Sequence, residues 1–374
     1  MRDILLLGGG KIGETICDLL KGAGDYRVTV ADRSAEALDW LPDHPRVAKR
    51  VLDAASPEDL GGAMQGRFAV LSALPYHLTV GVAEAARATG THYLDLTEDV
   101  ASTRRVKDLA ADAPCAFIPQ CGLAPGFISI VAHDVASRFE TLDSVRMRVG
   151  ALPKYPSNAL NYNLTWSTEG VINEYLEPCE AIVEGRLVSV PPLEEREEFS
   201  LDGVLYEAFN TSGGLGTLCE TLAGRVRTLN YRSVRYPGHR DLMKALLHDL
   251  RLGSRRELLK DILEHAIPAT LQDVVLIFVT VTGTRRGRLL QETYANKIYG
   301  REIGGKFYNG IQITTASGIC AVLDLLAAGK LPQRGFVKQE DVSYADFIAN
   351  RFGRNYAMPD RDTDIASPSV TRAA

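Results

Sequence analysis

Short apolar runs alternate with amphipathic stretches along the first 120 residues of the chain. Residues 3–24, DILLLGGGKIGETICDLLKGAG, are typical of a buried strand, a glycine-rich turn and a helix. The alternation continues with strands expected at 26–33, 46–54, 68–75, 92–97 and 115–120, and with helices at 57–66 and 78–90. Strands and helices in this order predict an α/β fold with a doubly wound parallel sheet of the Rossmann type.

From about residue 143 the pattern changes. Residues 142–153 and 274–296 are long apolar segments typical of strands, and polar and aromatic clusters separate them. We therefore expect residues 123–310 to form a second α/β domain with a mixed sheet. Residues 314–332 carry apolar positions at helical spacing, and the polar end of the chain, 357–374, is expected to be disordered.

Composition narrows the class of protein. A chain of 374 residues, 45% hydrophobic and 24% charged, is long enough for two globular domains. The net charge of −5 argues against a general nucleic-acid binder and a basic membrane-surface protein. No apolar run reaches the roughly 20 residues that span a bilayer, and the N-terminus lacks the pattern of a signal peptide. Six cysteines without a CxxC pair favour a reduced, cytoplasmic protein with no metal site.

The first turn carries a G-x-G-x-x-G motif at Gly8, Gly10 and Gly13. In this context the glycines allow a tight turn, close approach of a pyrophosphate and packing of the helix on the strand. Asp32 ends the second expected strand, where an acid can bind both ribose hydroxyls of a dinucleotide. The alternative is that Asp32 caps the next helix together with Ser34.

The acid favours NAD over NADP, because Asp32 would repel a 2′-phosphate. The neighbouring Arg33 is the reservation, since an arginine there can bind that phosphate. Other candidate cofactor contacts lie at the helix start and at the ends of the third and fourth strands: Lys11, Ile12, Asp53, Ala54, Ser72, Ala73, Leu74 and Pro75.

Candidate catalytic residues follow the fourth and fifth strands. The segment ALPYH leaves the carboxyl end of the fourth strand, which places Tyr76 and His77 near the expected nicotinamide. His77 is a candidate acid–base because an imidazole titrates near neutral pH; alternatively, it only starts the next helix. Glu98 follows the fifth strand and can hold a substrate ammonium, or else it is an acid at a helix start.

The second domain offers candidate substrate contacts. Arg235 and His239 in RYPGH can bind a carboxylate, although an internal salt bridge is an equal alternative. Thr211 and Ser212 precede an expected helix whose N–H groups can bind a carboxylate. Trp166 fits either an aliphatic substrate chain or the core, and Asn163 lies in the same polar segment.

Eight motifs occur in the order seen in the saccharopine dehydrogenase-like family, which the chain resembles up to about residue 342. They are GGGKIG, ALPYH, YLDLTED, CGLAPGF, NYNLTWSTEGVINEY, TSGGLGTLCETL, VRYPGH and TTASGICAVLDLLAAGKLPQRGFVKQEDV. The middle motifs look most like those of lysine 6-dehydrogenases, which oxidise the ε-carbon of lysine with NAD and release ammonia. Saccharopine reductases carry an acid in a GLDPG segment, where this chain has Ala124.

The resemblance implies a domain arrangement as well as an activity. The helix at 314–332 is expected to fold back, so that 1–122 and 311–356 form the NAD-binding domain. The second domain, 123–310, is expected to line the substrate cleft and to help form a homodimer.

Three functions compete for this chain. They are an NAD-dependent lysine ε-dehydrogenase, a saccharopine dehydrogenase or carboxyspermidine-type reductive aminase, and an NAD(H)-sensing protein without catalysis. The polar cluster of the middle domain argues against the third. The segments expected at the cleft carry one arginine, two histidines and the acids Glu98, Asp99 and Glu169. That balance favours a small amino-acid substrate with one carboxylate and a cation over saccharopine, which carries three carboxylates.

Overall fold

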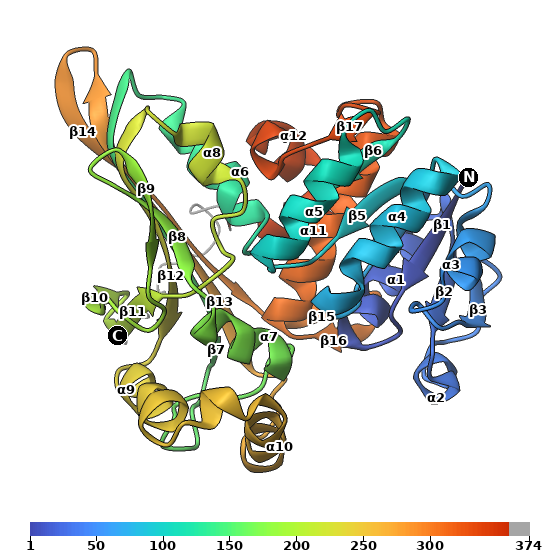
Figure 1. Cartoon of the computed structure of the whole chain (residues 1–374), viewed down its shortest axis with the longest axis horizontal. Coiled ribbons are helices and arrows are strands. Elements are labelled where there is room, and N and C mark those ends of the chain that lie inside the picture. The colour runs from blue at the N-terminus through green and yellow to red at the C-terminus, as the bar shows by residue number, and fades with distance from the viewer. Residues whose placement is uncertain (359–374) are drawn as a thin grey trace, which may run out of the picture.

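Among residues 1–358, seven strands form the sheet of the N-terminal domain, in the order β17-β6-β5-β4-β1-β2-β3 (Figure 1). Every neighbouring pair in it is parallel, which confirms the doubly wound fold. The strands are β1 (Arg2–Leu7), β2 (Tyr26–Asp32), β3 (Val47–Val51), β4 (Ala69–Ser72), β5 (His92–Asp95), β6 (Ala116–Ile118) and β17 (Gly335–Phe336). The order reverses between β1 and β4, and ligands bind at such a reversal, at the carboxyl edge of the strands.

The computed structural model describes residues 1–358. The predicted tail at 357–374 therefore lies outside the described residues, apart from its first two positions.

Helices cover both faces of this sheet. Ile4 and Leu6 of β1 pack into one core cluster, whereas Leu5 and Leu7 pack into another. Because successive side chains of a strand point to opposite faces, β1 is apolar throughout and buried on both sides. The covering helices are α1 (Lys11–Ala23), α2 (Ala35–Asp39), α3 (Pro57–Met64), α4 (Thr79–Thr89) and α5 (Val100–Ala110).

The chain returns to this domain at its C-terminal end. Helix α11 (Gly310–Ala327) lies against α1, and the Tyr26 hydroxyl donates to Asp324 Oδ1 at 2.6 Å. β17 then pairs with β6 and extends the sheet, and α12 (Tyr344–Ala349) follows.

Helix α11 has the length and apolar composition of a membrane-crossing helix. In the folded chain, however, 83% of it is buried inside the protein. Its first N–H groups bind a buried carboxylate: Asp273 accepts hydrogen bonds from Gly310 N and Ile311 N. These contacts are those of a core helix.

A second, mixed sheet has the strand order β10-β11-β12-β7-β13-β14, with β8 and β9 attached to β12. β12 and β7 are parallel and the other pairs are antiparallel, which confirms the predicted mixed sheet. The strands are β7 (Thr141–Pro153), β8 (Cys179–Val183), β9 (Arg186–Val190), β10 (Glu197–Leu201), β11 (Val204–Asn210), β12 (Val226–Arg235), β13 (Asp273–Arg285) and β14 (Arg288–Tyr299).

The remaining elements join and flank the two sheets. These elements are α6 (Phe127–Ala136), α7 (Thr168–Leu176), α8 (Leu218–Leu222), α9 (His239–Lys244), α10 (Arg256–Ala266), the hairpin β15 (Arg301–Ile303) and β16 (Lys306–Tyr308), and the short segments η1 (Tyr76–Leu78), η2 (Ala245–Asp249), η3 (Leu252–Ser254), η4 (Gln339–Asp341) and η5 (Gly353–Tyr356).

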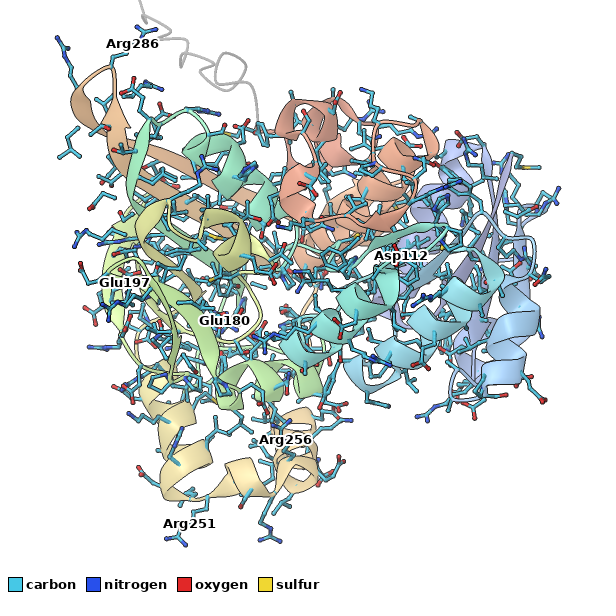
Figure 2. The ribbon with its side chains drawn as sticks, turned by 45° about the horizontal axis from the view of Figure 1, so that its top comes forward. Asp112, Glu180, Glu197, Arg251, Arg256 and Arg286 are labelled. Atoms are coloured by element: carbon cyan, nitrogen blue, oxygen red, sulfur yellow. The ribbon has the colours of Figure 1, made fainter. Side chains whose placement is uncertain are left out.

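The two sheets share one hydrophobic core. A single core cluster runs from Ile4 of the first sheet through Phe127 of α6 to Val279 of the second. At the surface of this junction Glu180 of β8, labelled in Figure 2, pairs with Arg104 of α5 at 2.5 Å.

Candidate active site

The glycine turn between β1 and α1 leaves open space at the start of α1. Gly8 has a left-handed φ of 100°, and a Cβ atom there would lie 2.8 Å from the Ala73 carbonyl oxygen. A Cβ atom on Gly13 would lie 1.9 Å from the Gly8 oxygen, so only glycine lets the helix pack on the turn. Gly10, by contrast, has no atom within 4 Å of its Cβ position, and no side chain caps α1. Uncapped N–H groups that face open space fit the diphosphate of a dinucleotide.

Asp32 lies beside this turn at the end of β2. Its Oδ2 accepts a hydrogen bond from Gly9 N at 2.7 Å, and its Oδ1 accepts one from Ser34 N at 2.9 Å. Helix α2 is capped by the Ser34 hydroxyl, which accepts from Ala37 N, and Asp32 supports this cap through the Ser34 N–H. The carboxylate therefore faces the glycine turn, as a ribose-binding acid does, and the next residue, Arg33, is exposed.

The other predicted cofactor residues lie along the same edge of the sheet. Lys11 begins α1 and is exposed. Asp53 and Ala54 follow β3, where Asp53 Oδ1 accepts from Ala55 N at 3.0 Å. Ser72 ends β4 and is buried. Four more line the central cavity: Ile12, Ala73, Leu74 and Pro75.

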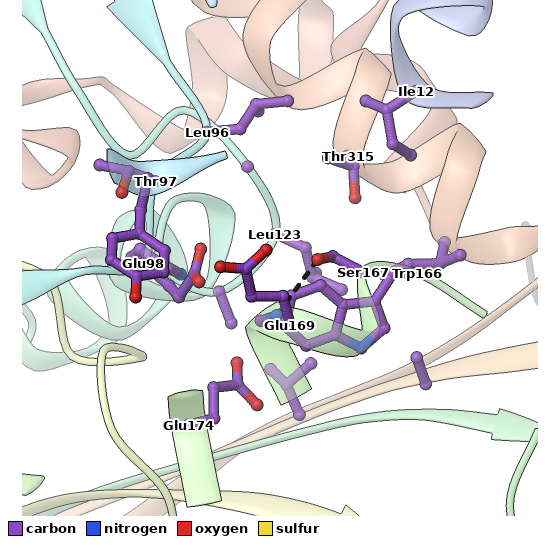
Figure 3. A pocket seen from close by; sticks show the side chains of 18 of the residues that line it. Ile12, Leu96, Thr97, Glu98, Leu123, Trp166, Ser167, Glu169, Glu174 and Thr315 are labelled. Carbon is purple, nitrogen blue, oxygen red and sulfur yellow. Dashed lines mark hydrogen bonds between the residues drawn. The ribbon is translucent and has the colours of Figure 1, made fainter. Parts of the chain in front are cut away.

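A cavity of about 280 Å³ lies between this edge and the second sheet (Figure 3). The first domain contributes Tyr76, Thr97 and Glu98 to its wall, from the segments that follow β4 and β5. The second domain contributes strand residues and the start of α7, and α11 closes one side. Residues of the second domain and α11 in the wall include Val149, Ala151, Trp166, Glu174, Arg235 and Thr315.

Three carboxylates point into this cavity: Glu98, Glu169 and Glu174 (Figure 3). Burial raises the pKa of Glu98 to about 7, and nearby acids including Glu169 add to the shift. Burial also raises the pKa of Glu174 to about 8, against the opposing charge of Arg235. Glu169 reaches the solvent side and lies 3.9 Å from the Lys260 ammonium. Carboxyl groups with pKa values near neutrality can accept or release a proton at physiological pH.

Arg235 is the cation of the cavity and is only 3% exposed. Its Nε donates to the Tyr175 hydroxyl at 2.8 Å, and its Nη1 donates to the Val234 carbonyl oxygen at 2.8 Å. The guanidinium also lies over the Tyr162 ring, 5.1 Å from its centroid. These contacts fix the side chain at the end of β12. The alternative, an internal salt bridge, is absent within residues 1–358, because no carboxylate lies within 4.0 Å of this guanidinium.

The RYPGH turn is held by a different acid, Glu207 of β11, which is fully buried. Its carboxylate accepts hydrogen bonds from Gly238 N and Arg240 N. Glu207 therefore fixes the turn and leaves Arg235 free to face the cavity.

Neither histidine of the sequence prediction lines the cavity. His77 follows Tyr76 in η1 and its side chain is exposed. His239 is 1% exposed, with Nδ1 2.8 Å from the Leu160 oxygen and Nε2 3.0 Å from the Tyr175 hydroxyl. Burial, reinforced by the charge of Arg235, lowers the pKa of His239 to about 3. His239 thus holds Tyr175, which in turn holds Arg235.

Three further candidates make internal hydrogen bonds away from the cavity wall. The Thr211 hydroxyl bonds to that of Ser233 at 2.8 Å, and the Ser212 hydroxyl donates to the Pro178 oxygen at 3.0 Å. Asn163 Nδ2 donates to the Pro268 oxygen at 3.0 Å. Their substrate contacts remain predictions without a geometric basis in the described residues.

The sequence prediction missed Glu174 and included Asp99 among the cleft acids. Asp99 instead caps α5, because its carboxylate accepts from Ser102 N at 2.7 Å. Ser167 caps α7. Glu174 lies two helical turns further along and faces the cavity. An acid among the buried apolar positions of the segment TEGVINEYL was the signal that could have revealed it.

Within residues 1–358 no cluster of three or more histidine, cysteine or acidic side chains has the geometry of a metal site. All six cysteines lie in this described part of the chain, where each is buried and none forms a disulfide.

Two family models match almost the whole chain. The model described as saccharopine dehydrogenase NADP binding domain matches residues 4–117, and the saccharopine dehydrogenase C-terminal domain matches residues 122–354. The chain belongs to the saccharopine dehydrogenase family. It is therefore an oxidoreductase with a domain that binds a pyridine nucleotide.

Curated relatives of this family member are distant. Mitochondrial alpha-aminoadipic semialdehyde synthase of Bos taurus is 22% identical over 317 residues, which are 80% of this chain and 33% of the bovine protein. The NADP(+), L-glutamate-forming saccharopine dehydrogenase of Saccharomyces cerevisiae is 26% identical over 184 residues, 46% of this chain and 40% of the yeast protein. The chain thus spans less than half the length of these relatives in the matched regions.

A solved structure supports the same fold. Apo histidine-tagged saccharopine dehydrogenase (L-Glu forming) from Saccharomyces cerevisiae superimposes with a TM-score of 0.76. The match has 17% sequence identity and covers 93% of this chain and 96% of the yeast chain.

The raised pKa of Glu174 predicts a pH-dependent stability. Because the folded chain binds this proton more tightly than the unfolded chain, the free energy of unfolding should fall as pH rises from 4.5 to about 8. Glu174→Gln should match the wild type near pH 4.5 and exceed it by a few kcal/mol near pH 8. Urea unfolding of both proteins without ligand, across this range, measures the difference. A difference that does not change with pH would contradict the assigned shift.

Proposed function

We propose that this chain is an NAD-dependent dehydrogenase that oxidatively deaminates the ε-amino group of L-lysine. The reaction consumes lysine, NAD⁺ and water, and it yields the 6-semialdehyde, ammonium, NADH and a proton. The semialdehyde then cyclises onto its own α-amine, with loss of water, to a piperideine carboxylate. The homodimer implied by the family resemblance and the cytoplasmic location favoured by the cysteine pattern stay predictions.

The observation that carries this proposal is the charge of the cavity. Among the described lining residues, Glu98, Glu169 and Glu174 face it together with one guanidinium, that of Arg235. Lysine brings two ammonium groups and one carboxylate, which complement this set. Saccharopine brings three carboxylates, and two of them would meet acids in a site of low dielectric, where like charges repel strongly. Ala124 lines the same cavity and adds no charge.

The protein groups have separate tasks in this proposal. Arg235 binds the substrate carboxylate, because its Nη2 has no partner within the described residues while Nε and Nη1 are occupied. Tyr76 and Trp166 pack on the aliphatic chain and exclude water. The chemistry that bound NAD supplies is the acceptance of a hydride.

Glu98 is the candidate base. The ε-nitrogen must lose a proton before hydride can leave the ε-carbon, and a carboxylate with a pKa of about 7 can take that proton at neutral pH. Glu98 follows β5 at the edge where nucleotide-binding segments meet the cavity. Glu169 stands near it as a second counter-charge for the ammonium.

Saccharopine dehydrogenase is the alternative, because the relatives with that name cover both domains of this chain at low identity. A carboxyspermidine-type reductive aminase stays a further alternative within the enzymes. We propose NAD because Asp32 faces the glycine turn, although the named yeast relative uses NADP(+).

The deciding assay compares kcat/KM for lysine and for saccharopine with NAD. We expect NADH formation with lysine, together with released ammonia, and at least about tenfold lower kcat/KM for saccharopine, from repulsion worth about 1.4 kcal/mol or more. Ornithine and putrescine serve as controls for chain length and for the carboxylate. Glutamate as the product, or a preference for saccharopine, would make the alternative correct.

Replacing the base should abolish most of the turnover. Glu98→Gln keeps the shape but cannot accept a proton, so kcat for lysine should fall roughly a hundred- to ten-thousandfold. In the wild type, kcat/KM should rise as pH rises through about 7, and the variant should lose this limb. His77→Asn is the matched comparison and should retain nearly full kcat, since His77 is exposed outside the cavity wall. The reverse result, an active Glu98→Gln and an inactive His77→Asn, would restore His77 as the acid–base.

Cofactor preference tests the role of Asp32. An unpaired 2′-phosphate beside its carboxylate should cost a few kcal/mol, so kcat/KM should favour NAD over NADP by on the order of a hundredfold. Asp32→Ser should narrow this ratio, and Arg33→Ala should lower only the residual use of NADP. Equal kcat/KM for the two nucleotides in the wild type would refute the proposal.

A further inference from the structure

The Glu174 carboxyl and the Arg235 guanidinium share the cavity without pairing. They are 6% and 3% exposed, respectively, and both line the cavity wall. Among residues 1–358, no nitrogen of Arg235 lies within 4.0 Å of a Glu174 oxygen, and the Glu174 carboxylate makes no hydrogen bond. Burial disfavours an ionised carboxylate without a partner, so an ammonium group bound beside Glu174 would stabilise the ionised form of this residue.

The separation is built into the elements that carry the two side chains. Glu174 and Tyr175 are neighbours on α7, and the Tyr175 hydroxyl accepts the hydrogen bond from Arg235 Nε. Tyr175 is itself held by His239, at 3.0 Å. Arg235 is therefore fixed from one side by α7, while the carboxylate of the preceding residue faces the cavity. These hydrogen bonds occupy Nε and Nη1 of Arg235 and leave its Nη2 available to a ligand.

We propose that Glu174 and Arg235 form one subsite for the head of an α-amino acid, with Glu174 binding the α-ammonium and Arg235 binding the α-carboxylate. An α-amino acid carries an ammonium and a carboxylate on one carbon, so a single ligand can pair with both Glu174 and Arg235. This inference rests on the proposed function only for the identity of the substrate side chain. The subsite itself would bind the α-ammonium and α-carboxylate of any amino acid whose side chain fits the cavity.

The position of the subsite sets the direction of the substrate. Ile12 and Thr315 lie at one end of the cavity and Glu174 at the other (Figure 3). Ile12 is the second residue of α1, beside the glycine turn, so the cofactor and the reacting carbon belong at the end away from Glu174. Apolar side chains that include Leu123 and Trp166 line the space between. The α-carbon is thus held at the far end, and the distal carbon of the chain is presented for oxidation.

Binding of three related ligands tests the subsite without turnover. Norleucine has both α-groups and an uncharged chain, hexanoate lacks the α-ammonium, and 6-aminohexanoate has only a distal ammonium. Calorimetric titration of the full chain with saturating NADH should show norleucine binding roughly ten- to a hundredfold more tightly than hexanoate. Glu174→Gln should remove this advantage and leave the affinity for hexanoate and 6-aminohexanoate within about twofold of the wild type, a difference under 0.5 kcal/mol.

Glu177→Gln is the matched control, because Glu177 ends the same helix and pairs with Arg256 outside the cavity. It should leave all three affinities unchanged, and thermal unfolding checks that both variants fold. Norleucine binding no better than hexanoate in the wild type, or a norleucine advantage that survives Glu174→Gln, overturns the inference. Loss of 6-aminohexanoate binding in Glu174→Gln also overturns it, because Glu174 would then hold the distal ammonium. If the norleucine advantage disappears as expected but lysine yields no NADH, the subsite stands and the proposed function falls.

Discussion

A carboxylate removed from water must find hydrogen bonds or an opposite charge, and the junction between the two domains is organised by this requirement. Asp95 accepts hydrogen bonds from the Tyr93 hydroxyl and from backbone N–H groups of two loops. Glu340 accepts from two threonine hydroxyls of the segment around α8. These buried acids are satisfied within the protein. Glu174 is buried to a similar degree but has no such partners, so the cavity is the one place at this junction where the described residues leave a buried acid for a ligand to satisfy.

Buried acids that have hydrogen-bond partners, such as Asp95, fix the cavity walls around Glu174. Asp95 binds Thr97 N and Gln120 N, which ties the loop carrying Glu98 to the loop that follows β6. On the other side of that loop, Gly213 packs so closely against the Glu98 backbone that a Cβ atom would lie 2.4 Å from its oxygen. A loop held from two sides keeps the position of its carboxyl group, which proton transfer to a bound substrate requires. The glycines of TSGGLG therefore shape the site through packing.

Local patterns were sufficient to predict the fold but only part of the site. The glycine spacing and the apolar strand β1 identified the parallel sheet, because both follow from rules that act within a few residues. Glu98 was found because it follows a strand, and Arg235 because an arginine beside the Pro-Gly turn of RYPGH can bind a carboxylate. The roles of Glu174 and His239 could be recognised only from tertiary packing. Glu174 points inward from α7, and the buried His239 ring forms a hydrogen bond that holds Tyr175. The spacing of residues along the sequence does not show which side of a loop will face a cavity whose other walls come from distant parts of the chain.

The return of the chain through α11 and β17 has a consequence for how the protein is made. The first sheet receives its last strand from residues 335–336, and the face of α1 is covered by a helix that begins at Gly310. While only the first 122 residues have emerged from the ribosome, the nucleotide-binding domain therefore has an exposed apolar face and an open sheet edge. The nascent chain must remain in this unfinished state while the whole second domain emerges. Protection by a chaperone during that interval, or a translation rate that shortens it, would then decide how much of the protein reaches its folded form.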